Sequence, residues 1–229
     1  MSKTSPIIYI VIPVYNEAKV IKNIINHIAV VGYTNIIAID DGSTDSSSSE
    51  IQKTAAVYIR HRLNRGKGAA IKTGLAAAKQ QGADIVVTMD SDGQHTPHDI
   101  AHLIQPILAG QAEVALGIRL KNRIQMPWHK KISNAIADEV TYLTSGIRVH
   151  DSQSGFRAYS HRALELINTR SDRYEFESEI IREIARYQLS YKEVPITTIY
   201  TNYASRKPQK QNFGNGLITL YKLIWNIFS

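Results

Sequence analysis

The chain contains 229 residues, of which 43% are hydrophobic, and this is enough to bury the core of one domain. It has no cysteine, which excludes disulfides, thiolate nucleophiles and zinc-thiolate sites. The formal net charge of +7 favours anionic partners, namely nucleic acid, acidic membrane surfaces or phosphorylated substrates. The apolar run at residues 7–14 is too short for a signal peptide and contains Pro13, so we expect a cytoplasmic protein.

Short apolar runs alternate with helical patterns in the first half of the chain. The runs predict strands at residues 7–14, 35–40, 56–61, 84–89 and 113–120. The intervening patterns predict helices at residues 17–30, 45–54, 67–80 and 97–109. Such alternation is typical of an α/β fold in which helices cover both faces of a mainly parallel sheet.

The second half has a less regular pattern. We predict a helix at residues 130–143, a strand at 156–159, helices at 161–167 and 176–187, and a strand at 192–200. Near the start of the helix predicted at residues 176–187 lie Glu175, Glu177 and Glu179. Acids at a helix N-terminus interact favourably with the helix dipole. We assign residues 1–200 to one domain and residues 201–229 to a tail, because a polar and basic stretch begins at residue 201.

The strand predicted at residues 84–89 ends in two carboxylates. Asp90 and Asp92 follow it, and Gln94 comes two residues later. Ligands of open α/β sheets bind outside the carboxyl ends of the strands. Oxygen ligands without His or Cys suit Mg²⁺ or Mn²⁺, and Mg²⁺ usually shares its ligand shell with substrate phosphates. The pattern predicts a metal site and a phosphorylated substrate, although an Asp- and Gly-rich turn is the alternative.

Other predicted strand ends also carry polar groups. Tyr15 and Glu17 follow the first strand, and Asp40 and Asp41 end the second. A carboxylate there can accept hydrogen bonds from a base or ribose, and a tyrosine can supply an aromatic wall. Helix capping is the alternative interpretation for Asn16 and for Ser43 or Thr44, but capping does not account for two adjacent acids.

The third predicted strand leads into a basic turn that contains two glycines. Residues 62–70 read RLNRGKGAA and open a helix. Glycines allow close backbone approach, the helix N-terminus attracts anions, and Lys67 adds a positive charge. The turn suits a diphosphate, but a solvated basic turn has the same composition. Neither a Walker A loop nor a GxGxxG fingerprint is present.

Five short motifs occur together in a fixed order. They are PVYNE (13–17), DDGS (40–43), NRGKG (64–68), DSDGQ (90–94) and DSQSGFR (151–157). This set resembles the family 2 glycosyltransferases, which have the GT-A (Rossmann-like) fold. It is most similar to their polyprenyl-phosphate branch, which includes the dolichol-phosphate mannose synthases. The similarity extends from about residue 8 to residue 200.

The resemblance implies roles for most of the polar residues at the strand ends. The residues that it places around the nucleoside of the donor are Pro13, Tyr15, Glu17, Asp40 and Asp41. It places Lys67 near the diphosphate, and it surrounds a Mg²⁺ or Mn²⁺ ion with Asp90, Asp92 and Gln94. Arg119 matches a position that faces phosphate, and Arg206 and Lys207 match basic residues of a loop that closes over the donor.

The implied activity is an inverting transfer of a sugar from a GDP- or UDP-linked donor. The metal, held by Asp92 and its neighbours, and the basic groups neutralise the leaving diphosphate while a nucleophile attacks from the opposite face. A polyprenyl phosphate can attack unaided, because the second pKa of a phosphate monoester is about 6. A hydroxyl acceptor needs a base. Asp151 is the candidate for that role or for orienting the acceptor, and a turn acid is the alternative.

Two other functions remain open. A family 2 glycosyltransferase that acts on a sugar or another hydroxyl acceptor would keep the same donor site. A non-catalytic, membrane-associated protein that binds a nucleotide sugar would also keep much of the pattern. The basic residues between positions 119 and 131 suit a lipid phosphate or a solvated face. No nucleic-acid motif accompanies them, so we expect no nucleic-acid binding.

The C-terminal tail has the pattern of an amphipathic helix. Its polar residues are Asn215, Thr219, Lys222, Asn226 and Ser229, which form one narrow stripe on a helix. Such a helix reaches only ~22 Å, short of the ~30 Å hydrocarbon core of a bilayer. We expect it to lie on a membrane surface or to pack against protein, including a second copy of the chain. The sequence leaves open whether a transmembrane segment follows.

Deleting residues 214–229 should release the protein from anionic vesicles, because the apolar face and Lys222 supply both hydrophobic and electrostatic attraction. Transfer to a long-chain polyprenyl phosphate should fall, and transfer to a short, water-soluble acceptor should survive. Co-sedimentation of the full-length and truncated chains with vesicles, run beside light scattering, measures both effects. Equal sedimentation would rule out the membrane role, and a change of mass would assign the tail to self-association.

Overall fold

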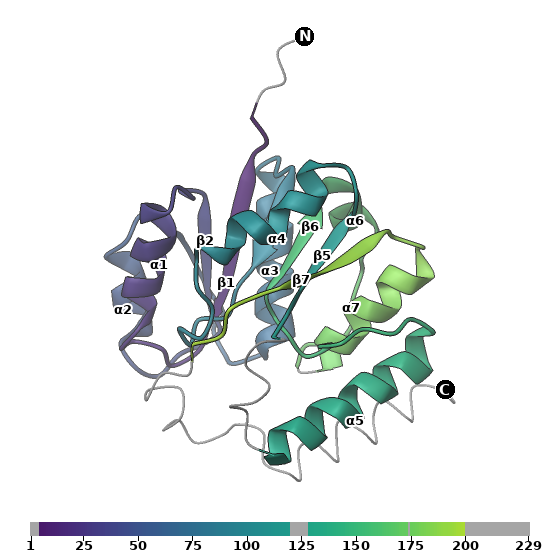
Figure 1. The fold of residues 1–229 in the computed structure, drawn as a ribbon. Coiled ribbons are helices and arrows are strands. Elements are labelled where there is room, and N and C mark those ends of the chain that lie inside the picture. The colour runs from purple at the N-terminus through teal and green to yellow at the C-terminus, as the bar shows by residue number, and fades with distance from the viewer. Residues whose placement is uncertain (1–4, 120–127, 174, 200–229) are drawn as a thin grey trace.

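The computed structural model describes residues 5–119, 128–173 and 175–199, which form one sheet with helices packed on it (Figure 1). The strands are β1 (Ile8–Val14), β2 (Ile36–Asp40), β3 (Val57–Arg60), β4 (Ile85–Thr88), β5 (Val114–Ile118), β6 (Arg157–Ser160) and β7 (Tyr191–Pro195). The helices are α1 (Ile21–Val30), α2 (Ser47–Gln52), α3 (Lys67–Gln80), α4 (Asp99–Leu108), α5 (Trp128–Ser145), α6 (His161–Leu166) and α7 (Glu175–Arg186).

The strand order across the sheet is β3-β2-β1-β4-β6-β5-β7. β6 is antiparallel to both of its neighbours, β4 and β5, whereas the other described strand pairs are parallel. The predicted mainly parallel α/β sheet is therefore confirmed. The predicted C-terminal helix lies outside the described residues.

Alternate residues of β1 pack against opposite layers, which explains why this strand is an unbroken apolar run. Ile10 and Ile12 belong to a cluster that includes residues of α1 and α4, whereas Val11 packs with residues of α3. α3 approaches the sheet closely at Gly74, where a Cβ atom would lie 2.3 Å from the Val11 side chain. Helices thus cover both faces, as the alternating pattern predicted.

Most predicted boundaries agree with the structure within two residues, and the start of the first helix is an exception. The predicted helix at residues 17–30 begins at Ile21, and residues 17–20 form a turn. Helix capping by Asn16 is therefore wrong. Asn16 has a left-handed backbone (φ 56°), and its side-chain oxygen accepts a hydrogen bond from the Thr44 N–H at 2.8 Å. It ties two strand-end loops together instead of capping a helix.

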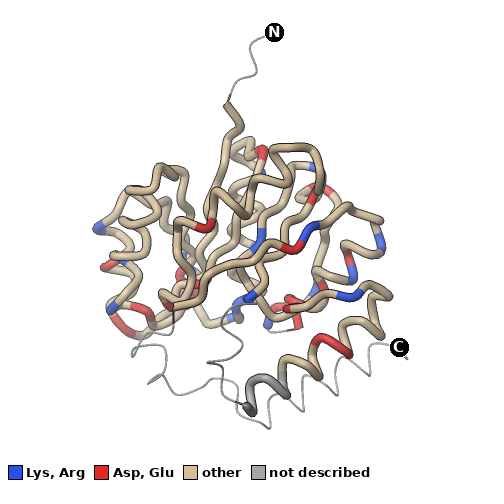
Figure 2. Tube along the Cα trace, viewed as in Figure 1, with Lys and Arg blue, Asp and Glu red and all other residues tan. Residues whose placement is uncertain are grey.

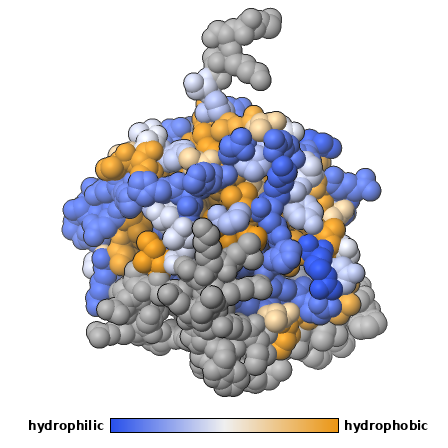
Figure 3. Space-filling view, viewed as in Figure 1, coloured by the Kyte–Doolittle hydropathy of each residue, from blue (hydrophilic) through white to orange (hydrophobic). Residues whose placement is uncertain are grey.

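The described residues on the visible surface include both hydrophilic and hydrophobic ones. On the face shown in Figure 3, hydrophilic residues separate the hydrophobic ones. Within the described part of the chain, no helix combines the length and apolarity that a membrane crossing requires.

A buried arginine joins β6 to α7. Arg157 is 1% exposed, and its guanidinium donates to the Ser152 carbonyl at 2.6 Å and to the Ser154 carbonyl at 2.9 Å. It also donates to the Glu177 carbonyl at 3.1 Å and lies 3.0 Å from the Glu177 carboxylate. One side chain therefore fixes the segment before β6 and the start of α7.

Replacing Arg157 with Met should lower the free energy of unfolding by ~3–5 kcal/mol, because the buried Glu177 carboxylate would lose its guanidinium partner. Arg162→Met is the matched control. Arg162 is 69% exposed and pairs with Glu113 at the surface, so its loss should cost under ~1 kcal/mol. Urea denaturation measures both values, and equal losses would contradict the role given to Arg157.

Candidate functional site

The carboxyl ends of β2, β1 and β4 lie next to one another, at the lower edge of the sheet in Figures 1 and 2. Asp40 ends β2, Tyr15 follows β1, and Asp90 follows β4 by two residues. Figure 2 shows acidic and basic residues gathered at this edge. The parallel pairing therefore brings together side chains that are far apart in the sequence.

Asp40 is fully buried and is held by its own loop. One carboxylate oxygen accepts from the Ser43 N–H at 2.8 Å, and the other accepts from the Ser48 hydroxyl. Arg60, at the end of β3, places its Nε atom 3.7 Å from the second oxygen. Asp40 thus shapes the turn after β2 in the structure described here.

Asp41 organises the turn that leads into α3. Its Oδ1 atom lies 2.7 Å from His61 Nδ1 and accepts from the Arg65 N–H at 3.0 Å, and its Oδ2 accepts from the Gly66 N–H at 2.8 Å. Gly66 has φ +114°, and a Cβ atom there would lie 2.3 Å from the Asp172 carbonyl oxygen. Glycine is therefore required at this position. The acid at the end of β2 fixes the backbone just before Lys67.

Lys67, the first residue of α3, lies between two carboxylates. Its Nζ atom is 2.6 Å from Asp90 Oδ1 and 2.9 Å from Glu177 Oε1, the second contact being an ion pair without hydrogen-bond geometry. Burial alone lowers the pKa of Lys67, but Asp90 and then Glu177 outweigh it and raise that pKa above its usual range. Likewise burial raises the pKa of Asp90, but Lys67 outweighs it and lowers the value. Lys67 and Asp90 are both charged at neutral pH.

A glycine makes room for this ion pair. A Cβ atom on Gly155 would lie 2.7 Å from Asp90 Oδ1 and closer still to Lys67 Nζ. The Gly155 carbonyl accepts a hydrogen bond from the Thr88 hydroxyl of β4 at 2.8 Å. The segment before β6 is thereby held against the end of β4.

Asp92 lies in a different electrostatic environment from Asp90. Burial, and then the charge of Asp90, raise the pKa of Asp92 above its usual value. One of its oxygens accepts from the Gln94 N–H at 2.9 Å. The ionised form of Asp92 therefore lacks the compensation that Lys67 gives to Asp90, and an added cation would supply it.

His95 completes this part of the site. It is 6% exposed, its ring stacks on Phe156 with centroids 4.9 Å apart, and its Nδ1 atom has no hydrogen-bond partner among the described residues. Burial lowers the pKa of His95 in spite of the opposing effect of Asp90 and Asp92, which keeps the ring neutral. Buried polar atoms are normally hydrogen-bonded, so the unpaired Nδ1 atom is a second sign that the site has a polar group without an internal partner in the described part of the chain.

Asp151 and Arg119 form a bidentate pair. Arg119 follows β5, and its Nε and Nη2 atoms donate to the two Asp151 oxygens at 2.6 Å each. The Arg119 N–H also donates to Asp151 at 3.1 Å. Both oxygens of Asp151 accept from arginine, which suits orientation of Arg119 better than proton removal from a hydroxyl.

The aspartates at the end of β4 fit a divalent cation. Asp90 and Asp92 supply hard oxygen ligands, and the two carboxylates lie close enough for the charge of Asp90 to add to the effect of burial and raise the pKa of Asp92. Among the residues that the structure describes, no group of three or more His, Cys, Asp or Glu is arranged to hold a metal ion. Further ligands would have to come from other groups, such as the predicted Gln94 amide or the phosphates of a donor.

Apart from Asp40, Asp41 and Gln94, the predicted site residues fall into three groups. Lys67, Asp90 and Asp92 come together, and Arg119 with Asp151 lies close enough to affect the pKa of Asp90. Pro13 and Glu17 are buried at the end of β1, with Tyr15 partly buried beside them, and the Glu17 N–H donates to the Ser47 hydroxyl at 2.7 Å. Arg206 and Lys207 lie outside the described residues.

Glu177, Gly155 and His95 are among the residues that sequence reasoning missed. Glu177 was interpreted as an acid that favours the helix dipole, and it does lie in the first turn of α7. It is also 3% exposed and contacts both Lys67 and Arg157. Gly155 belongs to a recognised motif, but its contact with Lys67 and Asp90 depends on the reversed strand β6, which no local pattern indicated.

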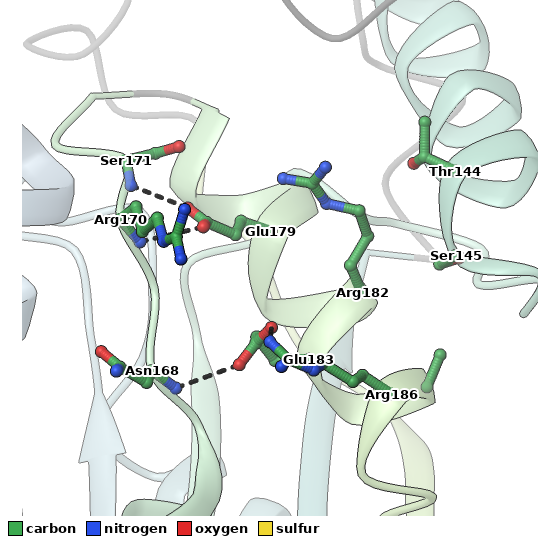
Figure 4. Close-up of a pocket in the computed structure, with 10 residues that line it drawn as sticks. Thr144, Ser145, Asn168, Arg170, Ser171, Glu179, Arg182, Glu183 and Arg186 are labelled. Atoms are coloured by element: carbon green, nitrogen blue, oxygen red, sulfur yellow. Dashed lines mark hydrogen bonds and ion pairs between the residues drawn. The ribbon is translucent and has the colours of Figure 1, made fainter. Parts of the chain in front are cut away.

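A pocket lies apart from the strand ends, between α5, α7 and the segment before α7 (Figure 4). Arg170, Arg182 and Glu179 are among its lining residues, and none of the predicted site residues that the structure describes lines it. Glu179 accepts from the N–H groups of Arg170 at 2.9 Å and Ser171 at 2.8 Å. Its carboxylate therefore holds the pocket wall together.

Comparison with known proteins agrees with the geometry of the strand ends. The family model "Glycosyl transferase family 2" matches residues 9–167. A UDP-N-acetylglucosamine--dolichyl-phosphate N-acetylglucosaminyltransferase of Methanococcus voltae is 41% identical, over 86% of this chain and 88% of that protein. A polyprenol monophosphomannose synthase of Mycolicibacterium smegmatis is 29% identical, over 82% of this chain and 76% of that protein.

The fold has a close counterpart among solved structures. Glucosyl-3-phosphoglycerate synthase from Mycobacterium tuberculosis, in complex with Mn²⁺, UDP-glucose and phosphoglyceric acid, superimposes with a TM-score of 0.73. The match covers 96% of this chain and 80% of that chain at 23% sequence identity, so it concerns the fold. The predicted GT-A architecture and the resemblance drawn from the five motifs are both confirmed. The chain belongs to glycosyl transferase family 2.

Proposed function

We propose that this chain transfers a sugar, with inversion, from a GDP- or UDP-linked donor to a polyprenyl phosphate. The observation that carries the proposal is the cluster of Lys67, Asp90 and Asp92 at the end of β4, where a diphosphate and a divalent cation can be neutralised together. The names of the Methanococcus and Mycolicibacterium relatives, both polyprenyl-phosphate sugar transferases, support the acceptor class.

The proposed donor site uses the ends of β1 and β2. Tyr15 and Glu17 would contact the nucleoside directly, along with the Pro13 backbone region. Asp40 and Asp41 are engaged with their own loops, so we propose that they act by shaping the surface under the nucleoside. Arg206 and Lys207 keep their proposed role of closing over the donor.

A Mg²⁺ or Mn²⁺ ion is part of the proposal. Asp90, Asp92 and Gln94 would hold it, and when bound it would neutralise the negative charge that develops on the leaving diphosphate. The structural neighbour was crystallised with Mn²⁺ and UDP-glucose, which is a finding about that protein. In this chain the support comes from the position of two carboxylates after one strand, β4, close enough together to interact electrostatically.

The proposed acceptor site centres on Arg119. Asp151 holds the guanidinium by both oxygens, so the positive charge of Arg119 would face the acceptor phosphate in a fixed orientation. An ionised phosphate needs no base. This geometry favours a phosphate acceptor over the alternative hydroxyl acceptor, which would require a free carboxylate. Attachment to the cytoplasmic face of a membrane through the tail remains part of the proposal.

Changing Asp92 to Asn should lower transfer by about 100-fold or more, because charge stabilisation by a metal ion is worth several kcal/mol. The fold should be retained. In the folded state the pKa of Asp92 is raised, so its ionisation lowers stability as pH rises above the unfolded pKa of about 3.9. At pH 7 and without metal, the variant should therefore melt at the same temperature as the parent or higher.

The matched control for Asp92→Asn is Asp84→Asn, which removes an exposed carboxylate at the opposite end of β4. That control should keep full transfer activity. Metal-dependent turnover measured on both variants, beside thermal melts, tests the assignment. Undiminished turnover of Asp92→Asn would refute a role for this carboxylate.

The acceptor class can be tested with a matched pair of lipids, a polyprenyl phosphate and the corresponding polyprenol. Transfer should occur to the phosphate alone, because only the phosphate brings an ionised nucleophile. A preliminary screen of UDP and GDP sugars with Mn²⁺ would identify the donor, since saturation at ~100 times Kd raises stability by about 2.7 kcal/mol. Equal transfer to the polyprenol would favour the hydroxyl alternative, and donor binding without any transfer would favour the non-catalytic one.

A further inference from the structure

Three charged side chains from separate parts of the chain meet beside the proposed cation site. Lys67 begins α3, Asp90 follows β4, and Glu177 lies in the first turn of α7. Lys67 Nζ is 2.6 Å from Asp90 and 2.9 Å from Glu177. The Lys67 and Asp90 side chains are only about a quarter exposed, so water screens their attraction weakly.

Glu177 is the fixed member of this group. Arg157 lies 3.0 Å from its carboxylate and donates to its carbonyl, and both side chains are almost completely buried. Lys67, in contrast, is a flexible side chain whose ammonium can turn about several bonds. Any rearrangement of the group would therefore move Lys67 rather than Glu177.

Lys67 and a divalent cation would compete for Asp90. An ammonium 2.6 Å from a carboxylate oxygen repels a second cation that approaches the same carboxylate. A bound diphosphate would end the competition by offering Lys67 another anionic partner close by. Since Glu177 keeps its hold on the ammonium, Lys67 could leave Asp90 without being released into solvent.

We propose that Lys67 is a built-in counter-ion of Asp90, positioned by Glu177, that makes divalent-cation binding conditional on the diphosphate of the donor. The inference rests on the proposed function, because it requires a divalent cation at Asp90 and Asp92. By linkage, the cation and the diphosphate then strengthen each other's binding through Lys67, in addition to any direct contact between them. Glu177 is a positioning residue in this scheme.

The first test is calorimetric titration of the nucleotide-free protein with Mn²⁺. Lys67→Met should tighten Mn²⁺ binding by about tenfold or more. A neighbouring cation lowers the proton affinity of a carboxylate by about ten- to a thousandfold, and we expect it to lower the affinity for a metal ion on a similar scale. Lys72→Met is the matched control. Lys72 lies on the same helix and pairs with Asp172 at 2.6 Å, so its removal should leave Mn²⁺ affinity unchanged.

The second test repeats the titrations in the presence of UDP or GDP. Nucleotide should tighten Mn²⁺ binding by a larger factor in the parent protein than in Lys67→Met, because only the parent has an ammonium to transfer from Asp90 to the diphosphate. An equal factor in both proteins would overturn the proposal. Neither measurement requires catalytic turnover.

The role of Glu177 is tested by a double-mutant cycle for Mn²⁺ affinity that combines Lys67→Met with Glu177→Gln. If Glu177 acts by positioning Lys67, its substitution should alter Mn²⁺ affinity in the parent background and have a much smaller effect once Lys67 is Met. Glu179→Gln removes a buried carboxylate two residues along α7 and should show no such coupling. Additive effects of Lys67→Met and Glu177→Gln would overturn the positioning role. If Glu177→Gln does not fold, the comparison of Lys67→Met with Lys72→Met still decides the counter-ion role.

The outcomes separate this inference from the proposed function. Mn²⁺ binding by the parent that Lys67→Met does not tighten would overturn the inference and leave the proposed function standing. Binding by Lys67→Met but not by the nucleotide-free parent would support the inference strongly. Failure of both proteins to bind Mn²⁺, with or without nucleotide, would overturn the inference together with the proposed cation.

Discussion

The reversed direction of β6 is the constraint on which the site depends. β6 lies between β4 and β5 and is antiparallel to both, so its first residue lies at the edge where its neighbours end. The segment that precedes it, residues 151–156, is thereby brought against Asp90 and Arg119. A parallel strand in the same position would have placed that segment at the opposite edge of the sheet, away from every residue proposed to act on the donor.

Charge compensation explains how so many ionised groups remain buried at this edge. Asp40 and Asp41 are held by backbone N–H groups and by neighbouring side chains, and Asp151 is held by Arg119. Arg157 and Lys67 neutralise Glu177. A buried charge is tolerated when it is paired and hydrogen-bonded. Asp92 has no such ion-pair partner among the described residues, and burial and then the charge of Asp90 raise its pKa.

Local patterns predicted the elements of the fold accurately. The helix at residues 67–80 has the predicted limits, because Gly66 just before it and Gly82 shortly after it mark both ends. The apolar runs predicted the strands within two residues, with one exception. The last strand was predicted to extend to residue 200, whereas β7 ends at Pro195. The carboxylate pair proposed to hold a cation, Asp90 and Asp92, was recognisable because both acids closely follow an apolar strand.

Contacts between distant segments were beyond the reach of the same reasoning. Glu177 is separated from Lys67 by most of the chain, and its position in the first turn of a helix already had a sufficient local explanation. Asn16 resembles a helix cap in sequence, but its partners are N–H groups in the loop after β2. Such residues become recognisable only when the strand order is known, because the strand order decides which loops meet.

The pairing of Arg119 with Asp151 also joins the two ends of a long connection between β5 and β6. The two residues are 32 positions apart, and three contacts hold them together. Closing a flexible loop becomes only slightly less favourable as the loop lengthens. A connection whose two ends are held together therefore tolerates insertions and deletions between them. The segment between them can therefore change in length at little cost in stability while β5 and β6, the strands on either side of it, keep their places.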